Sequence, residues 1–276
     1  MDIGIHVSLW TPEWTSSFLT YMEKAAEIGF DLVEIPIMDL SAFPLDEVKQ
    51  ILAKTGLKVR CGTGLGADTD ISSTDSALSS AGRDHLFRCI DIAAELGSPT
   101  LQGVIHSAWG AKTQVSEANR RASASGLKAV ARRAAGFNMS IALECINRYE
   151  SSFLNTVKQG IYMLDMIGED NAGLHLDTYH MNIEENSFQE AFRTAGSRMF
   201  HLHLSENQRG FPGGGLLDWK MIIQSAKSAG YKGPWVIESY VYPEFSTGSD
   251  VCIWRPIEKD PENGLKESLT MLREII

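Results

Sequence analysis

The segment at residues 172–177 reads Ala-Gly-Leu-His-Leu-Asp, and comparable segments read Ser-Ile-Ala-Leu-Glu at 140–144 and Met-Phe-His-Leu-His-Leu at 199–204. Each is a short apolar run of strand length that carries a polar side chain at or near its end. Stretches of helical period separate the three runs. This alternation predicts a parallel β-sheet in which each strand is followed by a helix.

The same alternation continues through the whole chain of 276 residues. The strand-like runs are Ile3–Val7, Leu32–Ile35, Lys58–Cys61, Thr100–Val104, Ser140–Glu144, Ala172–Leu176, Met199–Leu204 and Trp235–Glu238. Helices are expected around residues 16–28, 45–54, 75–96, 115–136, 155–167, 187–195 and 218–229, with a last helix at about 262–275. Eight strand–helix units in a chain near the ~250 residues typical of this architecture predict an α/β fold, a (β/α)8 TIM barrel that forms a single domain over residues 1–276.

Glycine residues stand between most of the expected helices and the strands that follow them. Gly29, Gly56, Gly97, Gly136 and Gly230 occupy positions where a left-handed backbone would end a helix. The alternative fold is an open, doubly wound sheet, which usually carries a glycine-rich turn after its first strand. Residues 8–14 read Ser-Leu-Trp-Thr-Pro-Glu-Trp at that place, so the barrel is favoured.

Composition narrows the class of protein. Hydrophobic residues make up 43% of the chain, enough for a large core, and the formal net charge of −10 disfavours nucleic acid as a partner. The four cysteines form no C-x-x-C pair, which argues against a zinc ribbon or a disulfide framework. The sequence shows neither a signal peptide nor an apolar run of about 20 residues. We therefore expect a cytoplasmic protein with no membrane partner.

Polar side chains occupy the carboxyl ends of the last four predicted strands. They are Glu144, Asp177, His203 and Glu238, separated by 33, 26 and 35 residues, each about one strand–helix unit. The carboxyl ends of barrel strands form one rim, where the active sites of TIM barrels lie. Three carboxylates at one place repel one another unless a cation is present. One histidine with three carboxylates suits Mn²⁺, Co²⁺ or Mg²⁺, so these four residues are predicted metal ligands.

Each of these residues, taken alone, also has an ordinary structural interpretation. A glutamate at a strand end is commonly ion-paired, and a buried histidine is commonly a hydrogen-bonded core residue. We favour the second interpretation for His175 and His201, which lie one layer deeper in the predicted barrel. Arg209 lies in the stretch Asn-Gln-Arg-Gly-Phe-Pro-Gly-Gly-Gly, a weak candidate for a phosphate cradle because it has no lysine and no clear helix start.

Longer motifs surround these residues. They read Leu-Glu-Cys-Ile-Asn-Arg-Tyr-Glu at 143–150, Leu-Asp-Thr-Tyr-His-Met-Asn-Ile-Glu-Glu at 176–185, and His-Leu-His at 201–203 continuing through Asn-Gln-Arg at 207–209 to Pro-Gly at 212–213. Together with residues 10–14 and 253–255, these motifs resemble the D-tagatose 3-epimerase/D-psicose 3-epimerase (ketose 3-epimerase) family of xylose isomerase-like barrels. The resemblance covers essentially the whole chain, and the second motif is the most specific.

The resemblance implies an isomerase that epimerises free ketose sugars at C3 through an enediolate, with a divalent metal ion, Mn²⁺ before Co²⁺ or Mg²⁺. It implies that Glu144, Asp177, His203 and Glu238 hold the metal and that Glu144 and Glu238 also form the acid/base pair. Removing the weakly acidic C3 proton requires a polarised neighbouring carbonyl, which a cation near O2 and O3 provides. Inversion requires two groups because a single group would restore the starting configuration.

The same likeness implies that Glu150, His180 and Arg209 hold the O1–O3 end of the sugar and that Trp109 packs against it. Two alternatives stay open: Trp109 as a rim packing residue only, and Glu150 in a plain surface ion pair with Arg148.

The chain departs from the family pattern at three places. His6 stands where an aromatic residue is common, segment 61–67 is richer in glycine, and segment 239–244 differs from the usual Glu-Pro-Phe. These positions are expected to shape the pocket around C4–C6 of the sugar. His6 either binds a sugar hydroxyl or is a structural strand-end histidine.

Three other functions are alternatives to epimerisation of a small-molecule sugar. An aldose–ketose isomerase on the same metal-dependent barrel would move hydrogen between C1 and C2. A metal-dependent DNA-repair endonuclease would need more rim histidines and a basic face, whereas this chain has seven histidines in all and a charge of −10. A non-catalytic sugar-binding barrel is disfavoured because both candidate acid/base glutamates are present. The resemblance further implies a homodimer or homotetramer.

Overall fold

The structure, a computed structural model, describes residues 1–15, 17–112 and 114–276. Eight parallel strands close into a barrel in the order of the sequence, and β8 pairs back to β1. The strands are β1 (Ile3–His6), β2 (Leu32–Pro36), β3 (Lys58–Gly62), β4 (Thr100–Gly103), β5 (Ser140–Glu144), β6 (Ala172–Asp177), β7 (Met199–Leu204) and β8 (Trp235–Ile237). The predicted (β/α)8 TIM barrel is thereby confirmed.

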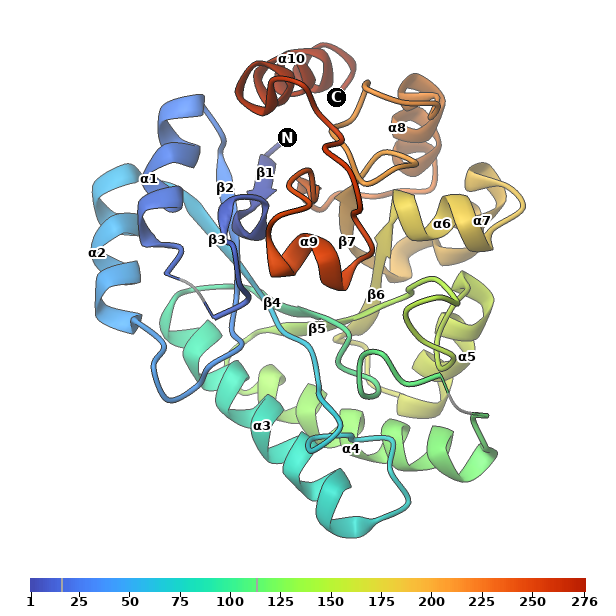
Figure 1. The fold of residues 1–276 in the computed structure, drawn as a ribbon. Helices are drawn as coiled ribbons and strands as arrows, with labels where there is room; N and C mark the ends of the chain where they lie inside the picture. The colour runs from blue at the N-terminus through green and yellow to red at the C-terminus, as the bar shows by residue number, and fades with distance from the viewer. Residues whose placement is uncertain (16, 113) are drawn as a thin grey trace.

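Most helices surround the strands on the outside of the barrel, whereas α9 (Ser246–Asp250) lies near the middle of the view in Figure 1, and Asp250 lines the cavity at the strand ends. The helices are α1 (Leu19–Ile28), α2 (Leu45–Thr55), α3 (Ser76–Glu95), α4 (Glu117–Ala135), α5 (Val157–Ile167), α6 (Thr178–Glu184), α7 (Phe188–Ala195), α8 (Trp219–Ser228), α9 (Ser246–Asp250) and α10 (Pro261–Ile275), with short 3-10 helices η1 (Val7–Trp10) and η2 (Gly196–Arg198). Each predicted helix is present within a few residues of its expected bounds; residue 16, the predicted start of the first, lies outside the described residues. Among the described residues, no helix combines the length and apolar character needed to cross a bilayer.

The helix starts follow local chemistry. Ser116 and Thr156 cap α4 and α5, each in a reciprocal capping box with the residue three positions on. α6, a short helix that begins directly after β6, is not among the predicted helices. Its cap is Asp177, whose carboxylate accepts hydrogen bonds from the backbone N–H groups of Tyr179 and His180. A predicted metal ligand therefore also starts a helix.

Four of the five predicted glycine stops are confirmed. Gly29, Gly56, Gly97 and Gly230 have φ values of 103°, 72°, 75° and 92°. The prediction was wrong for Gly136, whose φ is −61°. The left-handed residue after α4 is Asn138, with φ of 57°, because the chain makes further turns before it reverses and asparagine tolerates this conformation.

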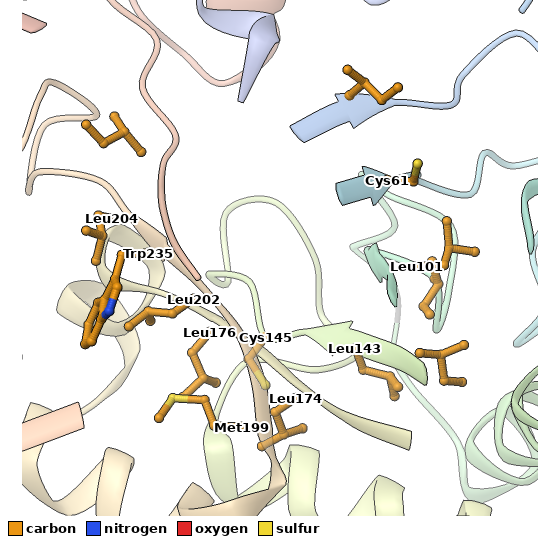
Figure 2. Close-up of a cluster of buried hydrophobic side chains, with 14 of the residues drawn as sticks. Cys61, Leu101, Leu143, Cys145, Leu174, Leu176, Met199, Leu202, Leu204 and Trp235 are labelled. Carbon is orange, nitrogen blue, oxygen red and sulfur yellow. The ribbon is translucent and has the colours of Figure 1, made fainter. Parts of the chain in front are cut away.

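Strand residues alternate between the barrel interior and the helical layer. In the pairing of β6 with β7, His175 lies beside His201 and Asp177 beside His203, which puts the predicted ligands one layer above the deeper histidines. The intervening leucines join the hydrophobic cluster outside the barrel. Figure 2 shows the labelled Leu174, Leu176, Leu202 and Leu204 in this cluster with Trp235.

Candidate metal and sugar site

The four predicted metal ligands meet at the carboxyl end of the barrel. Glu144 and Asp177 are the last residues of β5 and β6, His203 is the penultimate residue of β7, and Glu238 follows β8 directly. One ligand atom from each residue lies within 4.8 Å of those of the other three, and all four side chains are buried. The parallel strands therefore bring together residues that are far apart in the sequence.

A cavity of about 290 Å³ opens onto this cluster. The five residues predicted to bind substrate all line it: His6, Trp109, Glu150, His180 and Arg209. Its other walls include glycines of the segment after β3 and apolar side chains such as Met38 and Val104. The cavity is of the size and mixed polarity expected for a small-molecule site.

His203 connects the cluster to a residue that the sequence analysis missed. Its Nε2 is 3.0 Å from Glu34 Oε2, and the same oxygen lies 2.7 Å from His201 Nε2. Glu34 belongs to β2 and is almost fully buried. The signal that marks it is a glutamate inside the otherwise apolar strand Leu-Val-Glu-Ile-Pro, because a buried carboxylate needs partners.

The cluster fits a divalent cation. His203 Nδ1 is buried and has no hydrogen-bond partner among the described residues, while it lies 3.5 Å from Glu238 Oε1 and 3.8 Å from Asp177 Oδ2. A ring nitrogen aimed at carboxylate oxygens, with the opposite nitrogen bonded to a carboxylate, is the usual arrangement of a metal-ligating histidine. We conclude that these donors suit a hard or borderline ion.

Arg209 also enters the cluster. Its Nη1 lies 3.1 Å from Asp177 Oδ2 and 2.8 Å from Glu238 Oε2, and its guanidinium stacks over Tyr179 at 4.2 Å. The backbone of Arg209 is left-handed, with φ of 69°. The side chain is buried, so its positive charge offsets the two carboxylates directly.

The acidic groups differ in their affinity for protons. Burial and the negative charge of Glu238 raise the pKa of Glu144 well above its usual value, and burial raises the pKa of Asp177 from 3.8 to about 6. For Glu238, burial acts in the same upward direction, but the positive charges of His203 and Arg209 outweigh it and hold the pKa well below its usual value. Without an added cation, Glu144 therefore holds a proton more strongly than Glu238 does.

The two deeper histidines differ in their hydrogen bonding. His201 bonds to Glu34, as a core histidine is expected to do. His175 is equally buried, yet neither of its ring nitrogens has a hydrogen-bond partner among the described residues. Its ring packs edge-on against those of His201 and His203, with centroids 4.7 Å and 4.1 Å apart. The expected hydrogen-bonded core role therefore holds for His201 and not for His175.

The predicted sugar-binding residues Glu150, His180 and Arg209 lie together beside β5 and β6. Arg209 Nη2 lies 3.0 Å from His180 Nε2. The side chain of Asn147, another residue that the sequence analysis missed, donates to His180 Nδ1 at 2.8 Å and to Glu150 Oε1 at 2.8 Å. Asn147 therefore fixes the orientation of both neighbours.

The alternative ion pair between Arg148 and Glu150 is wrong. Arg148 Nε and Nη2 each lie 2.9 Å from a carboxylate oxygen of Glu184, on α6. Glu150 instead faces the cavity. Trp109 is 38% exposed at the cavity mouth, with its indole N–H 3.4 Å from Glu150 Oε2.

The phosphate-cradle alternative for the glycine-rich stretch also fails. The buried carboxylate of Glu206 lies inside this loop and accepts hydrogen bonds from the backbone N–H groups of Gly213 at 3.2 Å and Leu217 at 2.9 Å, and from the indole of Trp219 at 2.7 Å. The donors that would bind a phosphate already hold a negative charge. The loop instead positions Arg209.

A chain of polar contacts joins His6 to Glu238. Ser8 Oγ lies 2.5 Å from His6 Nδ1 and 3.4 Å from the phenol oxygen of Tyr240. The phenol in turn donates to Glu238 Oε1 at 3.2 Å. Two of the three places where the sequence departs from the family pattern therefore meet beside a candidate acid/base residue.

Comparisons with known proteins agree with this architecture. The family model described as xylose isomerase-like TIM barrel matches residues 22–275. A ketose 3-epimerase of Arthrobacter globiformis is 37% identical over 95% of this chain and 92% of its own, and a D-psicose 3-epimerase of Agrobacterium fabrum is 33% identical over 93% and 91%. The crystal structure of a D-allulose 3-epimerase from Methylomonas sp. with D-allulose superposes with a TM-score of 0.94 at 32% identity, covering 100% of this chain and 97% of the other.

Proposed function

This chain belongs to the xylose isomerase-like TIM barrel family, and within it to the ketose 3-epimerases, so we propose that it epimerises free ketose sugars at C3 with the help of a divalent metal ion. The observation that carries the proposal is the cluster of Glu144, Asp177, His203 and Glu238, three of which line a cavity of sugar size: Glu144, His203 and Glu238. Relatives named for the same reaction match over nearly the whole chain.

Those four residues would hold the metal, and we propose Mn²⁺ as the native ion, with Co²⁺ and Mg²⁺ accepted by the same donors. When bound, the ion would supply charge stabilisation to the oxygens at C2 and C3 of the sugar. Glu34 orients His203 for this role through its hydrogen bond to Nε2.

Glu144 and Glu238 would exchange the proton at C3. They extend from β5 and β8, which are three strands apart in the barrel, so that a sugar between them presents opposite faces to the two carboxyl groups. The two carboxyl groups have different surroundings, because His203 and Arg209 lower the pKa of Glu238 and burial raises the pKa of Glu144. One takes the proton from C3 and the other returns a proton to the opposite face, which inverts the centre.

Glu150, His180 and Arg209 would hold the O1–O3 end of the sugar. The guanidinium of Arg209 lies within the carboxylate cluster, where it can donate to the oxygen that gains negative charge as the enediolate forms. Trp109, at the mouth of the cavity, would cover the sugar and exclude water. We assign a sugar contact to His6 as well, on the opposite wall.

The experiment is incubation of metal-stripped and Mn²⁺-reconstituted protein with D-psicose, D-tagatose, D-fructose and L-ribulose in deuterated water. We expect metal-dependent inversion at C3 with deuterium incorporated at that carbon. Formation of aldoses would move the activity to the alternative aldose–ketose isomerase. Tight sugar binding without turnover or exchange would identify a non-catalytic sugar-binding barrel.

We further propose that residues 1–276 form one domain and that the protein acts in the cytoplasm as a homodimer or homotetramer. The closed barrel supports the single domain, the lack of a signal peptide pattern supports the cytoplasm, and the family resemblance supports the assembly. Sedimentation equilibrium of the full chain would decide between these two assemblies and a monomer.

A further inference from the structure

Glu34 has one carboxylate oxygen that the metal site does not use. Its Oε2 bonds to His201 and His203, whereas its Oε1 accepts no hydrogen bond from any of the residues that the structure describes. Glu34 lines the cavity. The free oxygen is therefore a hydrogen-bond acceptor available from the cavity side.

His6 has one ring nitrogen that can donate a hydrogen bond, whereas the free oxygen of Glu34 can accept one. The backbone N–H of Ser8 donates to His6 Nδ1 at 3.3 Å, so Nδ1 carries a lone pair and the proton of the neutral ring lies on Nε2. His6 lines the same cavity, and no hydrogen bond joins its Nε2 to a described residue. It presents an unused N–H donor.

Gly62 brings these two groups to one space. His6 pairs with Glu34 across β1 and β2, and Gly62 is the last residue of β3, next to β2. A Cβ at Gly62 would lie 3.1 Å from Glu34 Oε1 and 4.0 Å from His6 Nε2. The space over Gly62 thus has a free acceptor on one side and a free donor on the other; we call these three residues the 6/34/62 subsite.

We propose that the 6/34/62 subsite binds one hydroxyl group on the C4–C6 part of the ketose and selects substrates that carry it. A hydroxyl both donates and accepts, so it satisfies Glu34 Oε1 and His6 Nε2 together. The subsite lies on β1–β3, across the barrel from His180 and Glu150 beside β5 and β6. This inference rests on the proposed function for the direction of the sugar, whose O1–O3 end faces His180.

Sugar binding tests the subsite independently of turnover. Calorimetry would measure the Kd of the Mn²⁺-loaded protein for D-fructose and for its 1-, 4-, 5- and 6-deoxy analogues. The variants are His6→Phe, which removes the donor and keeps a ring, and Gly62→Ala, which fills the space while leaving donor and acceptor in place. Met38→Leu is the matched control, because Met38 lines the same cavity without a polar group.

In the wild-type protein, one of the 4-, 5- or 6-deoxy analogues should bind about tenfold more weakly than D-fructose, since a buried donor and acceptor lose their partner. His6→Phe and Gly62→Ala should each reduce this difference to about twofold or less by weakening D-fructose binding, because a hydroxyl without its partners contributes little. Neither variant should change the penalty for the 1-deoxy analogue, and Met38→Leu should change none of the ratios.

Two results would overturn the proposal: equal binding of D-fructose and all three C4–C6 deoxy analogues by the wild-type protein, or a deoxy penalty that both variants leave intact. Either would mean that the space over Gly62 holds only water. Failure of the proposed function gives a different pattern, namely normal binding ratios with no exchange at C3 in the deuterated-water experiment.

Discussion

Arg209 shows how much a single side chain can determine in this site. Its buried guanidinium lies between Asp177 and Glu238, and it also lies beside His180. Two carboxylates therefore depend on one cation for neutralisation when no metal ion is present. Removal of one partner of a buried ion pair leaves the other charge uncompensated. The resulting loss of stability is much larger than the stability that the intact pair adds relative to apolar residues at the same positions.

Replacement of Arg209 by Gln should lower the unfolding free energy of the metal-stripped protein by about 3–5 kcal/mol. Saturating Mn²⁺ should recover a large part of this loss, since the ion neutralises the same carboxylates. Urea denaturation with and without metal would measure both quantities. Arg133→Gln is the control: Arg133 and its partner Asp91 are both about 40% exposed, and the loss should stay within about 1 kcal/mol in either condition.

Tyr240 is a positioning residue for Glu238. Its phenol holds Oε1 while Arg209 holds Oε2, so the carboxylate is fixed at both oxygens. Tyr240→Phe should reduce kcat about fivefold to twentyfold with little change in KM, because one hydrogen bond that orients the carboxylate is lost.

The distinguishing measurement for Tyr240→Phe is exchange of the C3 proton with solvent, followed from each epimer separately. Exchange should slow for the epimer whose C3 proton faces Glu238 and stay near the wild-type rate for the epimer that faces Glu144. Equal slowing from both epimers would mean that the phenol only supports the fold. Tyr149→Phe, at an exposed position, should alter neither rate.

At the scale of elements, the loop between β7 and α8 is organised around Glu206. Its carboxylate accepts four hydrogen bonds, from the backbone of Asn207, Gly213 and Leu217 and from the indole of Trp219. A Cβ at Gly215 would lie 2.3 Å from Glu206 Cγ, so the loop closes tightly over this side chain. The backbone N–H of Arg209 also donates to the Glu206 carbonyl at 3.0 Å, which ties the site to the loop.

Glu206→Gln replaces an acceptor oxygen with an amide group that faces donors. We expect a loss of about 2–4 kcal/mol in unfolding free energy and a severalfold rise in KM, because the loop that carries Arg209 loses its internal partner. Thermal unfolding and steady-state kinetics would test the two effects together. Glu267→Gln, on the exposed side of α10, is the control and should change neither quantity. An unchanged KM in Glu206→Gln would mean that the hydrogen bonds of Glu206 do not determine the position of Arg209.

For the molecule as a whole, the residues that could hold a metal ion at the carboxyl end of the barrel are also groups that bind protons. Burial raises the pKa of Asp177 to about 6 and that of Glu144 well above its usual value, and the pKa of His203 is also raised, because Glu34 and Glu238 outweigh the effect of burial. Each group must lose its proton to act as a ligand. A raised pKa therefore weakens metal binding at every pH below it.

The affinity for Mn²⁺ should accordingly fall by at least about tenfold for each unit of pH below 6, since at least one proton must be displaced. At a fixed metal concentration above Kd, the free energy of unfolding that metal binding contributes should decrease by about 1.4 kcal/mol for each pH unit below 6. Metal titrations and urea denaturation between pH 5 and 8 would measure the two slopes. An affinity independent of pH would contradict the assignment of these residues as ligands. Asp177→Asn should abolish most of the affinity and flatten the dependence.

Local patterns were sufficient for the frame of the barrel and for the four metal-site residues. Alternation of apolar runs with helical segments depends on near neighbours, and the rule that parallel strands end at one rim converts Glu144, Asp177, His203 and Glu238 into a cluster. The prediction of a left-handed backbone at Gly136 was wrong, because the residue at which the chain reverses depends on how the turn packs. Asn138 takes the left-handed conformation instead.

The sequence by itself determined the number and order of strands and the residues presented at their ends, because these follow from periodicity along the chain. Only the tertiary structure decided which side chains pair across the barrel. Glu34 meets His201 and His203 from 167 and 169 positions away, and Arg148 bonds to Glu184 in place of Glu150. Such pairs depend on strand register, barrel closure and the free energy of satisfying buried charges, and no local pattern encodes these.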